Sequence, residues 1–176
     1  SASCRGGTYL LGRMHLSRYG ANAAATALTA FERAVRLDAE HAAAYAGMAQ
    51  AQVWLGQYAR IPNAQARANG LAAIKRALRI DPELVEAHAT LGYISFLYEW
   101  DWSAAESSFL HAIGLNPSSS YAHELYLNYL AAVGRVDEAV EHAQIAKRLD
   151  PESGIIARQL VLALYYADNE RNKERL

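Results

Sequence analysis

Apolar residues recur along the chain with the period of an α-helix, and no segment alternates in the manner of a β-strand. Ala105, Phe109 and Ala112, for example, occupy positions i, i+4 and i+7, which form one stripe on a helix. The same stripe recurs over 27–34 and 139–146. The pattern predicts eight helices and the beginning of a ninth, at 8–19, 22–37, 41–55, 63–80, 84–98, 102–115, 119–133, 136–149 and 153–167.

A short motif, Ala-x-x-(Leu/Ile)-(Asp/Asn)-(Pro/Ala), ends every second predicted helix. The motif forms the first six residues of the similar segments 34–46, 77–89, 112–124 and 146–158. Pro82, Pro117 and Pro151 are 35 and 34 residues apart, whereas Ala39, in the same place of the motif, precedes Pro82 by 43 residues. The chain therefore divides into helix pairs, with units at 8–39, 41–82, 84–117 and 119–151 and a partial unit at 153–176.

Small residues in the stripes allow the helices of a pair to approach closely, and Phe31 and Phe109 are expected to fill the gap to the neighbouring pair. Gly56 and Gly134 are expected to form the turns within the second and fourth pairs. The longer second unit contains an insertion at 60–70, where Pro62 is expected to start or offset a lengthened helix.

The period of about 34 residues, with a small residue, an aromatic residue and a proline in fixed places, resembles the tetratricopeptide repeat (TPR). The resemblance covers nearly the whole chain. It implies an all-α fold, a right-handed α-solenoid of antiparallel helix pairs with about four TPR units and part of a fifth, in a single domain over 1–176. A narrower resemblance rests on YLLGRMHLSRYG, EWDWSAAE and AHELYLNYLAAVGRVDEAVEHA. These stretches look like the TPR region that is attached to the other domains of bacterial winged-helix transcription activators, adenylate cyclases and serine/threonine kinases.

The resemblance also implies where a partner binds, because the first helices of stacked pairs line a concave surface. Equivalent positions on these helices give an aromatic and mildly acidic set of groove candidates: Gln50, Val53, Trp54, Glu86, Tyr93, Phe96, Leu97, Tyr121, Glu124 and Asn128. For each aromatic ring in this set, the alternative to binding a partner is packing against a neighbouring repeat unit. TPR proteins that bind the C-terminal carboxylate of a partner peptide use lysine and asparagine at two of these positions. This chain has no lysine there, so no such clamp is expected.

Composition and charge narrow the function classes. A net charge of −1 over 176 residues lacks the excess of Lys and Arg that nucleic-acid binding needs, so no direct nucleic-acid binding is expected. The six histidines lack metal-ligand spacing, and no nucleophile with a base or phosphate-binding loop is visible, so we expect no metal, no cofactor and no catalysis.

Cellular location is constrained only weakly. Cys4 is the only cysteine, so no intrachain disulfide can form, which fits a cytoplasmic protein. No apolar run approaches the ~20 residues that span a bilayer, so no membrane insertion is expected of this chain. The chain begins without methionine, which indicates a fragment of a longer protein.

Two hypotheses of function follow. The first is an interaction scaffold that binds a protein or peptide ligand, as the interaction part of a larger bacterial regulator. The second is a self-associating or ligand-sensing domain that controls an attached DNA-binding or catalytic domain. Homo-oligomers would then form through the open last unit, where Leu160, Leu164 and Tyr165 are expected to be exposed. The polar ending YADNERNKERL, with Lys173 in place of a small residue, is either a cut repeat or a cap.

The stretch YEWDWSAAE (98–106) replaces the usual glycine turn of the third pair and carries one extra residue. Asp101 is placed to cap the following helix, with Ser103 and Glu106 as an alternative capping box. We expect Trp102 to pack in the core. We expect Trp100 to pack against the turn, with a surface contact to a partner as its alternative.

Overall fold

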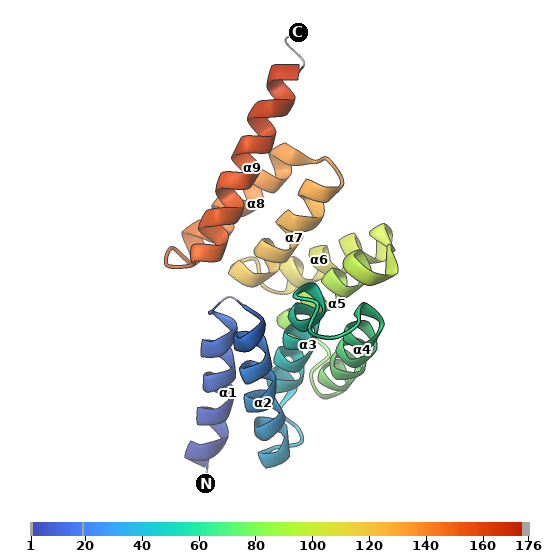
Figure 1. The fold of residues 1–176 in the computed structure, drawn as a ribbon, viewed down its shortest axis with the longest axis vertical. Helices are drawn as coiled ribbons and strands as arrows, with labels where there is room; N and C mark the ends of the chain where they lie inside the picture. Colours follow the sequence, from blue (N-terminus) through green and yellow to red (C-terminus); the bar gives the residue numbers. More distant parts are fainter. Residues whose placement is uncertain (1, 19, 174–176) are drawn as a thin grey trace.

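The computed structural model describes residues 2–18 and 20–173, and the side chains of residues 7–18 and 20–168. This part of the chain contains nine α-helices and one π-helical turn (Figure 1). The elements are α1 (Ala2–Leu16), α2 (Ala21–Leu37), α3 (Ala42–Gln57), α4 (Asn63–Ile80), α5 (Val85–Ile94), η1 (Ser95–Glu99), α6 (Trp102–Leu115), α7 (Ser120–Ala132), α8 (Val136–Leu149) and α9 (Gly154–Lys173). The side chains of Cys4 and Lys173, both singled out from the sequence, lie outside the described part.

Each helix packs against the next along the chain, and the helix pairs stack into a curved solenoid with α1 and α9 at opposite ends of its long axis (Figure 1). The curvature brings the start of α9 back toward the first helices, because Ile155 packs against the core cluster that contains Leu16 and Trp54. The all-α solenoid of helix pairs expected from the sequence is therefore confirmed.

Small residues bring the helices together as the sequence predicts. Phe109 is fully buried, and a Cβ atom built on Gly92 would lie 3.0 Å from the carbonyl oxygen of Ala105 and 3.1 Å from the Phe109 ring. Phe31 is also fully buried, between Gly12 and Gly47, where an added Cβ would come within 2.5 Å of its ring. Glycine at these sites makes room for the rings that join neighbouring pairs.

The two expected glycine turns differ. Gly134 has φ +81°, the left-handed conformation that favours glycine, and ends α7 as predicted. The prediction for Gly56 was wrong, because α3 continues through it to Gln57 and the left-handed residue is Ala59, with φ +54°. Gly56 is instead a close-packing site, since an added Cβ would lie 2.6 Å from the Tyr98 hydroxyl oxygen and 2.7 Å from the Ala66 Cβ.

The joint at 98–106 absorbs its extra residue in the wide π-helical turn η1. Trp100 follows in the left-handed conformation, with φ +56°. The amide N–H groups of Trp100 and Asp101 both donate to the Ser95 carbonyl, and the Asp101 carboxylate then accepts from the Ala104 amide at 2.9 Å. The predicted Asp101 cap is confirmed.

The two tryptophans of the joint are more exposed than expected. Trp102 was predicted to be core, but 38% of its surface is accessible, because the wide turn carries its ring to the rim of the solenoid. There it lies beside Phe96 and Tyr129, with ring centroids 5.5 and 6.2 Å away. Trp100 is 70% exposed, so its ring is available to a partner and contributes little to the core.

Candidate functional site

Two adjoining cavities lie on the inner face of the solenoid, with volumes of about 450 Å³ and about 270 Å³. Their walls come from α1, α3, α5, α7 and α9 and from the turns that adjoin these helices. Trp54 and Glu124 line both cavities, so the two cavities adjoin at these residues. We call the two cavities together the concave groove.

The start of α7 sets the position of Glu124. The Ser119 hydroxyl caps the helix by accepting from the Ala122 amide at 3.2 Å. The His123 ring is buried, and its Nε2 lies 3.0 Å from the Pro117 carbonyl oxygen at the end of the preceding pair. The next residue is Glu124, whose side chain lines the groove, and Asn128 lies one helical turn further on.

Asn128 and Gln159 form a hydrogen-bonded chain whose direction is fixed. The Asn128 side-chain N–H donates to the Glu124 carbonyl at 2.8 Å, because a carbonyl can only accept. The Asn128 Oδ1 then faces Gln159 and accepts from its Nε2 at 3.1 Å. The Gln159 Oε1 must therefore point away from Asn128, and this buried oxygen accepts no hydrogen bond within the described structure. It is an acceptor without a donor.

The Glu124 carboxylate is a second acceptor that lacks a donor from the described protein, but it is only partly buried, unlike the Gln159 oxygen. Among the described residues it accepts no hydrogen bond and forms no ion pair, although Arg13 and Arg158 lie near enough to act on its charge. Burial, followed by the negative charge of Asp150, raises the pKa of the Glu124 carboxyl to about 7, although the positive charges of Arg13 and Arg158 oppose the shift. Near neutral pH the groove thus contains a carboxyl group that is only partly ionised.

Two tyrosines form polar sites on the groove wall, and each hydroxyl group has one hydrogen-bond partner. The Tyr93 hydroxyl accepts from the Gln57 side-chain amide at 3.1 Å, and burial raises the pKa of Tyr93 to about 12. The Tyr121 hydroxyl lies 2.9 Å from the Thr90 Oγ1, and burial raises the pKa of Tyr121 as well. Both phenols stay neutral at physiological pH, so these two tyrosines add no charge to the wall near Glu124.

The structure brings together six of the ten groove candidates from the sequence. The cavities are lined by Gln50, Trp54, Tyr93, Tyr121, Glu124 and Asn128. The other four lie elsewhere: Val53 is buried in the core, Phe96 packs on Trp102 and Tyr129, Glu86 lines neither cavity, and Leu97 lines a separate hollow.

Sequence reasoning missed part of the groove lining, including Arg13, Gln57, Tyr58, Asp150, Ile155, Arg158 and Gln159. A signal for two of these residues was available. Tyr121 and Glu124 follow Pro117 by four and seven residues, and the same offsets after Pro151 mark Ile155 and Arg158. Gln159 has no such signal, because its role depends on Asn128, 31 residues earlier.

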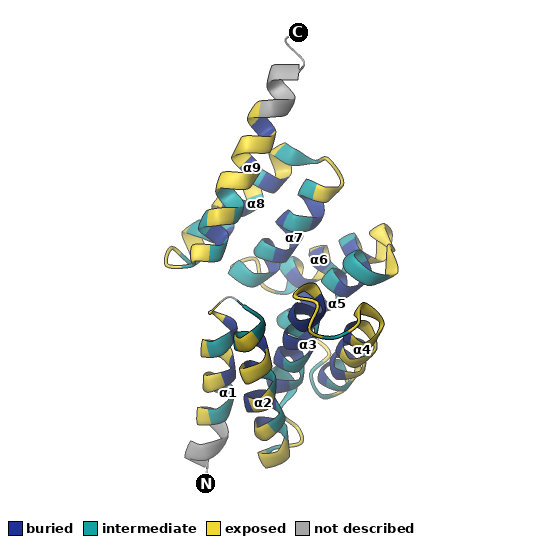
Figure 2. Cartoon of the chain, viewed as in Figure 1, coloured by how far each residue is buried: buried dark blue, intermediate teal, exposed yellow. Residues whose placement is uncertain are grey.

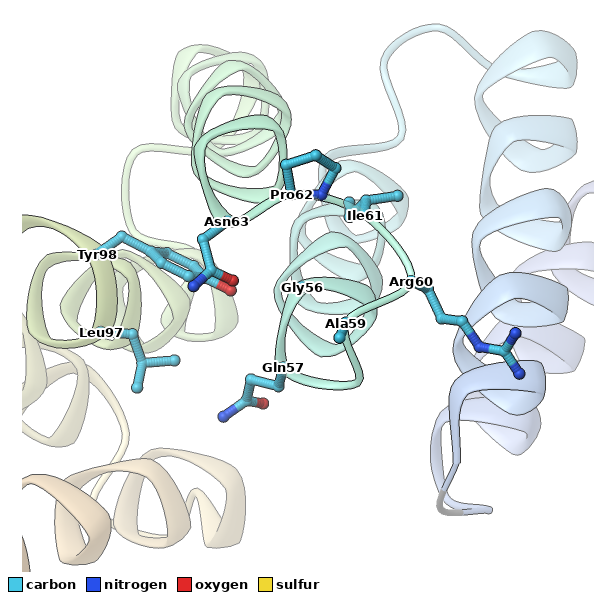
Figure 3. A pocket seen from close by; sticks show the side chains of 9 residues that line it. All are labelled: Gly56, Gln57, Ala59, Arg60, Ile61, Pro62, Asn63, Leu97 and Tyr98. Carbon is cyan, nitrogen blue, oxygen red and sulfur yellow. The ribbon is translucent and has the colours of Figure 1, made fainter.

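The hollow that Leu97 lines has a volume of about 700 Å³ and lies beside the connection between α3 and α4 (Figure 3). The side chains of Tyr98 and Asn63 lie side by side at one edge of it, and Arg60 points away toward the first helices (Figure 3). The Tyr98 hydroxyl donates to the Val53 carbonyl at 3.1 Å, and Arg60 donates to Asn22 at 3.4 Å. These polar groups already have partners, so the hollow offers a ligand less than the groove does.

The histidines and acidic residues do not assemble into a metal centre. In the part of the chain that the structure describes, no group of three or more His, Cys, Asp or Glu side chains is arranged to hold a metal ion. His123 and His142 place their Nδ1 atoms 2.7 Å apart, which is a hydrogen bond between rings. None of the described helices combines the length and the apolar character that crossing a membrane requires.

Comparison with known proteins identifies the fold. No protein-family model matches the chain, and no curated protein matches it. Among solved structures it is similar to TTC0263, a thermophilic TPR protein of Thermus thermophilus, with 21% identity and a TM-score of 0.70 over 90% of this chain and 80% of that one. It is also similar to MamA, with 15% identity and a TM-score of 0.53 over 96% of this chain and 85% of that one.

A third similar structure is the human IFIT1 dimer with m7Gppp-AAAA. It has 20% identity and a TM-score of 0.73 over 92% of this chain, which spans only 35% of the IFIT1 chain. At these identities the likeness shows the fold alone. The chain thus has the tetratricopeptide-repeat fold, and its groove must be interpreted from its own residues.

Proposed function

We propose that this tetratricopeptide-repeat solenoid is a protein–protein interaction scaffold that holds a segment of a partner protein in its concave groove. The observation that carries the proposal is that the two adjoining cavities share Trp54 and Glu124 and that their lining residues come from helices between α1 and α9. Aromatic rings interleaved with amide groups suit a peptide, because rings bury apolar side chains while amides pair with its backbone.

The charge of the groove favours a protein ligand over a nucleic acid. Three acidic residues, Glu124, Asp150 and Glu152, line it, against two arginines, Arg13 and Arg158. Phosphate groups need a local excess of positive charge, which this lining lacks. The IFIT1 structure contains m7Gppp-AAAA, but the acidic groove here supports a different ligand class for this chain.

We further propose that the chain is the interaction part of a larger bacterial regulator. This finer proposal is supported by the sequence resemblance to the TPR regions of transcription activators, adenylate cyclases and serine/threonine kinases. The gene sequence on either side of this segment tests it. A winged-helix or catalytic domain in the same reading frame is the expected result, and an unrelated neighbouring domain would contradict it.

Blocking the groove should abolish peptide binding. Gln50 lines the larger cavity beside Trp54, so Gln50→Arg is expected to obstruct it with a longer side chain. Peptides selected from a displayed random library on the wild-type protein should bind Gln50→Arg at least tenfold more weakly, as measured by fluorescence anisotropy.

The matched control is Gln144→Arg, which makes the same change at an exposed position of α8, away from both cavities. Selected peptides should bind this variant as tightly as the wild type. The proposal fails if the library yields no binder, or if both variants bind equally well.

Self-association is a second candidate function, favoured by the outer face of α9, most of which is exposed (Figure 2). Ile156, Ala163 and Ala167 are buried on one side of this helix. Its other sides expose five large apolar residues, Val161, Leu162, Leu164, Tyr165 and Tyr166. Of the residues expected there, Leu164 and Tyr165 are exposed, and Leu160 is partly buried.

If α9 pairs with a second copy, the weight-average mass measured by sedimentation equilibrium should rise with protein concentration toward twice 19.3 kDa. Val161→Glu, at a residue with 66% exposure, should restore the monomer by placing a charge in the interface. A constant monomer mass up to 1 mM, on the order of the upper limit of such measurements, would rule this function out.

A further inference from the structure

The groove contains two hydrogen-bond acceptors that the described protein does not satisfy. One is the buried Gln159 Oε1, and the other is the Glu124 carboxylate. Both residues line the cavity of about 270 Å³. A buried acceptor without a donor costs free energy, so a ligand that brings N–H donors to the Gln159 oxygen would recover that cost and would meet Glu124 in the same cavity.

The chemistry of that ligand follows from the kind of atom left unsatisfied. The Asn128 amide is committed to the Glu124 carbonyl and to Gln159, so the orientation of both amides is fixed and the atom left without any partner is an acceptor, the Gln159 Oε1. A ligand group with several N–H donors and a positive charge would pair with both acceptors at once. At these two acceptors a carboxylate or phosphate would be repelled, so an anion would have to bind elsewhere in the groove, beside Arg158.

We propose that this cavity is a subsite that binds a basic side chain of the partner protein, arginine above all, through Glu124 and Gln159. The inference rests on the proposed scaffold function and specifies the ligand of its groove. A guanidinium group can bind a carboxylate with two N–H groups and still donate to a second acceptor. An ammonium group has three donors but holds its water more strongly, which makes burial costlier.

The walls of the cavity suit a planar cation. Trp54, Tyr58 and Tyr93 line it, and aromatic faces attract guanidinium groups that lie over them. The Tyr93 hydroxyl oxygen already accepts a hydrogen bond from Gln57, so we expect the ligand to contact the Tyr93 ring rather than the hydroxyl. The aromatic walls would thus hold the apolar part of an arginine side chain while Glu124 and Gln159 bind its head group.

Charged groups on the neighbouring helices modulate the site without occupying it. Arg13 from α1 and Arg158 from α9 favour the ionised form of Glu124, and Asp150 from the turn before α9 opposes it. A ligand cation has to compete with these two arginines for the carboxylate. Because burial also raises the pKa of Glu124 to about 7, binding should weaken as the pH falls below neutrality and a proton takes the place of the cation.

The test is an NMR titration of the uniformly ¹⁵N-labelled protein with the capped tripeptide acetyl-Gly-Arg-Gly-amide. The side-chain amide signals of Asn128 and Gln159 should shift on binding. Replacing the arginine by citrulline, which keeps the shape but loses the charge, should raise Kd at least tenfold, and replacing it by lysine should raise Kd by a smaller factor. Binding should be several-fold weaker at pH 5.5 than at pH 8.

Glu124→Gln should bind the arginine tripeptide at least tenfold more weakly, while its backbone spectrum shows that it remains folded. Glu83→Gln, the same change at an exposed site in the turn before α5, should bind like the wild type. The inference is overturned if 10 mM tripeptide shifts neither amide signal, if citrulline binds as well as arginine, or if Glu124→Gln binds normally.

Failure of this subsite can be distinguished from failure of the scaffold function. If library-selected peptides bind the groove and Gln50→Arg blocks them, but Glu124→Gln does not weaken them, the scaffold stands and the basic-side-chain subsite is wrong. If the tripeptide binds through Glu124 while no selected peptide is sensitive to Gln50→Arg, the subsite stands and the longer groove does not bind peptides.

Discussion

Replacing Phe109 with alanine is expected to lower the free energy of unfolding by about 3–5 kcal/mol, as for other fully buried aromatic residues. The Phe109 ring is completely buried between helix pairs. Its centroid lies 5.5 Å from that of Tyr126 and 5.8 Å from that of Tyr129, and the backbone of Gly92 approaches it closely. Alanine would remove these contacts and leave a cavity where α5, α6 and α7 meet, which the stiff helices could only partly close.

Urea unfolding followed by circular dichroism would measure the loss. The control is Leu110→Ala, at the adjacent position of the same helix, where the side chain is 52% exposed and the loss should stay within about 1 kcal/mol. If the two variants lost similar amounts of unfolding free energy, the Phe109 ring would not be what holds the neighbouring helix pairs together. Two separate transitions in Phe109→Ala would instead indicate that the solenoid unfolds in blocks on either side of the cavity.

The helices could be predicted because their ends are set by nearby residues. Predicted and observed bounds coincide for α4, which follows Pro62, and for α6, which Asp101 caps. Helix packing was equally predictable, since small residues recur with the helical period around Phe31 and Phe109. Local chemistry therefore accounts for most of the fold.

The errors lie where a contact with a distant residue or a local irregularity of the backbone overrides the repeat pattern. Gly56 has the sequence pattern of a turn, but its contacts with Tyr98 and Ala66 make it a packing site. Trp102 has the spacing of a core residue, but the π-helical turn before it moves its ring to the rim. A neighbouring unit decided the first case, and a local departure from the repeat decided the second; the periodicity of the repeat reveals neither.

The sequence allowed us to predict which helices line the candidate site, but not which of its polar atoms lack a partner. The period of the repeat marked Glu124 and Asn128 as groove residues, because each first helix presents equivalent positions to the same side. The unsatisfied oxygen of Gln159 could not be predicted, because it arises only when α9 packs beside α7 and Asn128 fixes the direction of the amide chain. The proposed preference for a basic side chain emerges from that contact between units.

Replacing Glu124 with glutamine is expected to stabilise the protein at pH 8 by about 2 kcal/mol and to change its stability little near pH 4.5. Burial raises the pKa of Glu124 from 4.5 to about 7 in the folded state. Between these two values the folded state holds a proton that the unfolded state has released, so stability falls as the pH rises and levels off above about 7. Glutamine stays neutral and avoids this loss.

The full pKa shift corresponds to roughly 3 kcal/mol of unfolding free energy. The expected stabilisation is smaller because water reaches the carboxylate through the cavity.

The measurement is the difference in free energy of unfolding between Glu124→Gln and the wild type, from urea titrations at several pH values between 4.5 and 8. Taking the difference at each pH removes the contribution of other groups, such as His142, that titrate in both proteins. Glu83→Gln is the control and should show a flat, near-zero difference. If Glu124→Gln were instead less stable than the wild type at pH 8, the carboxylate would be stabilised by Arg13 or Arg158 in the free protein. If Glu124→Gln both stabilises the free protein and abolishes binding of the arginine tripeptide, that pair of results would show that the carboxylate lowers the stability of the free protein and is needed for binding, as expected of a functional group.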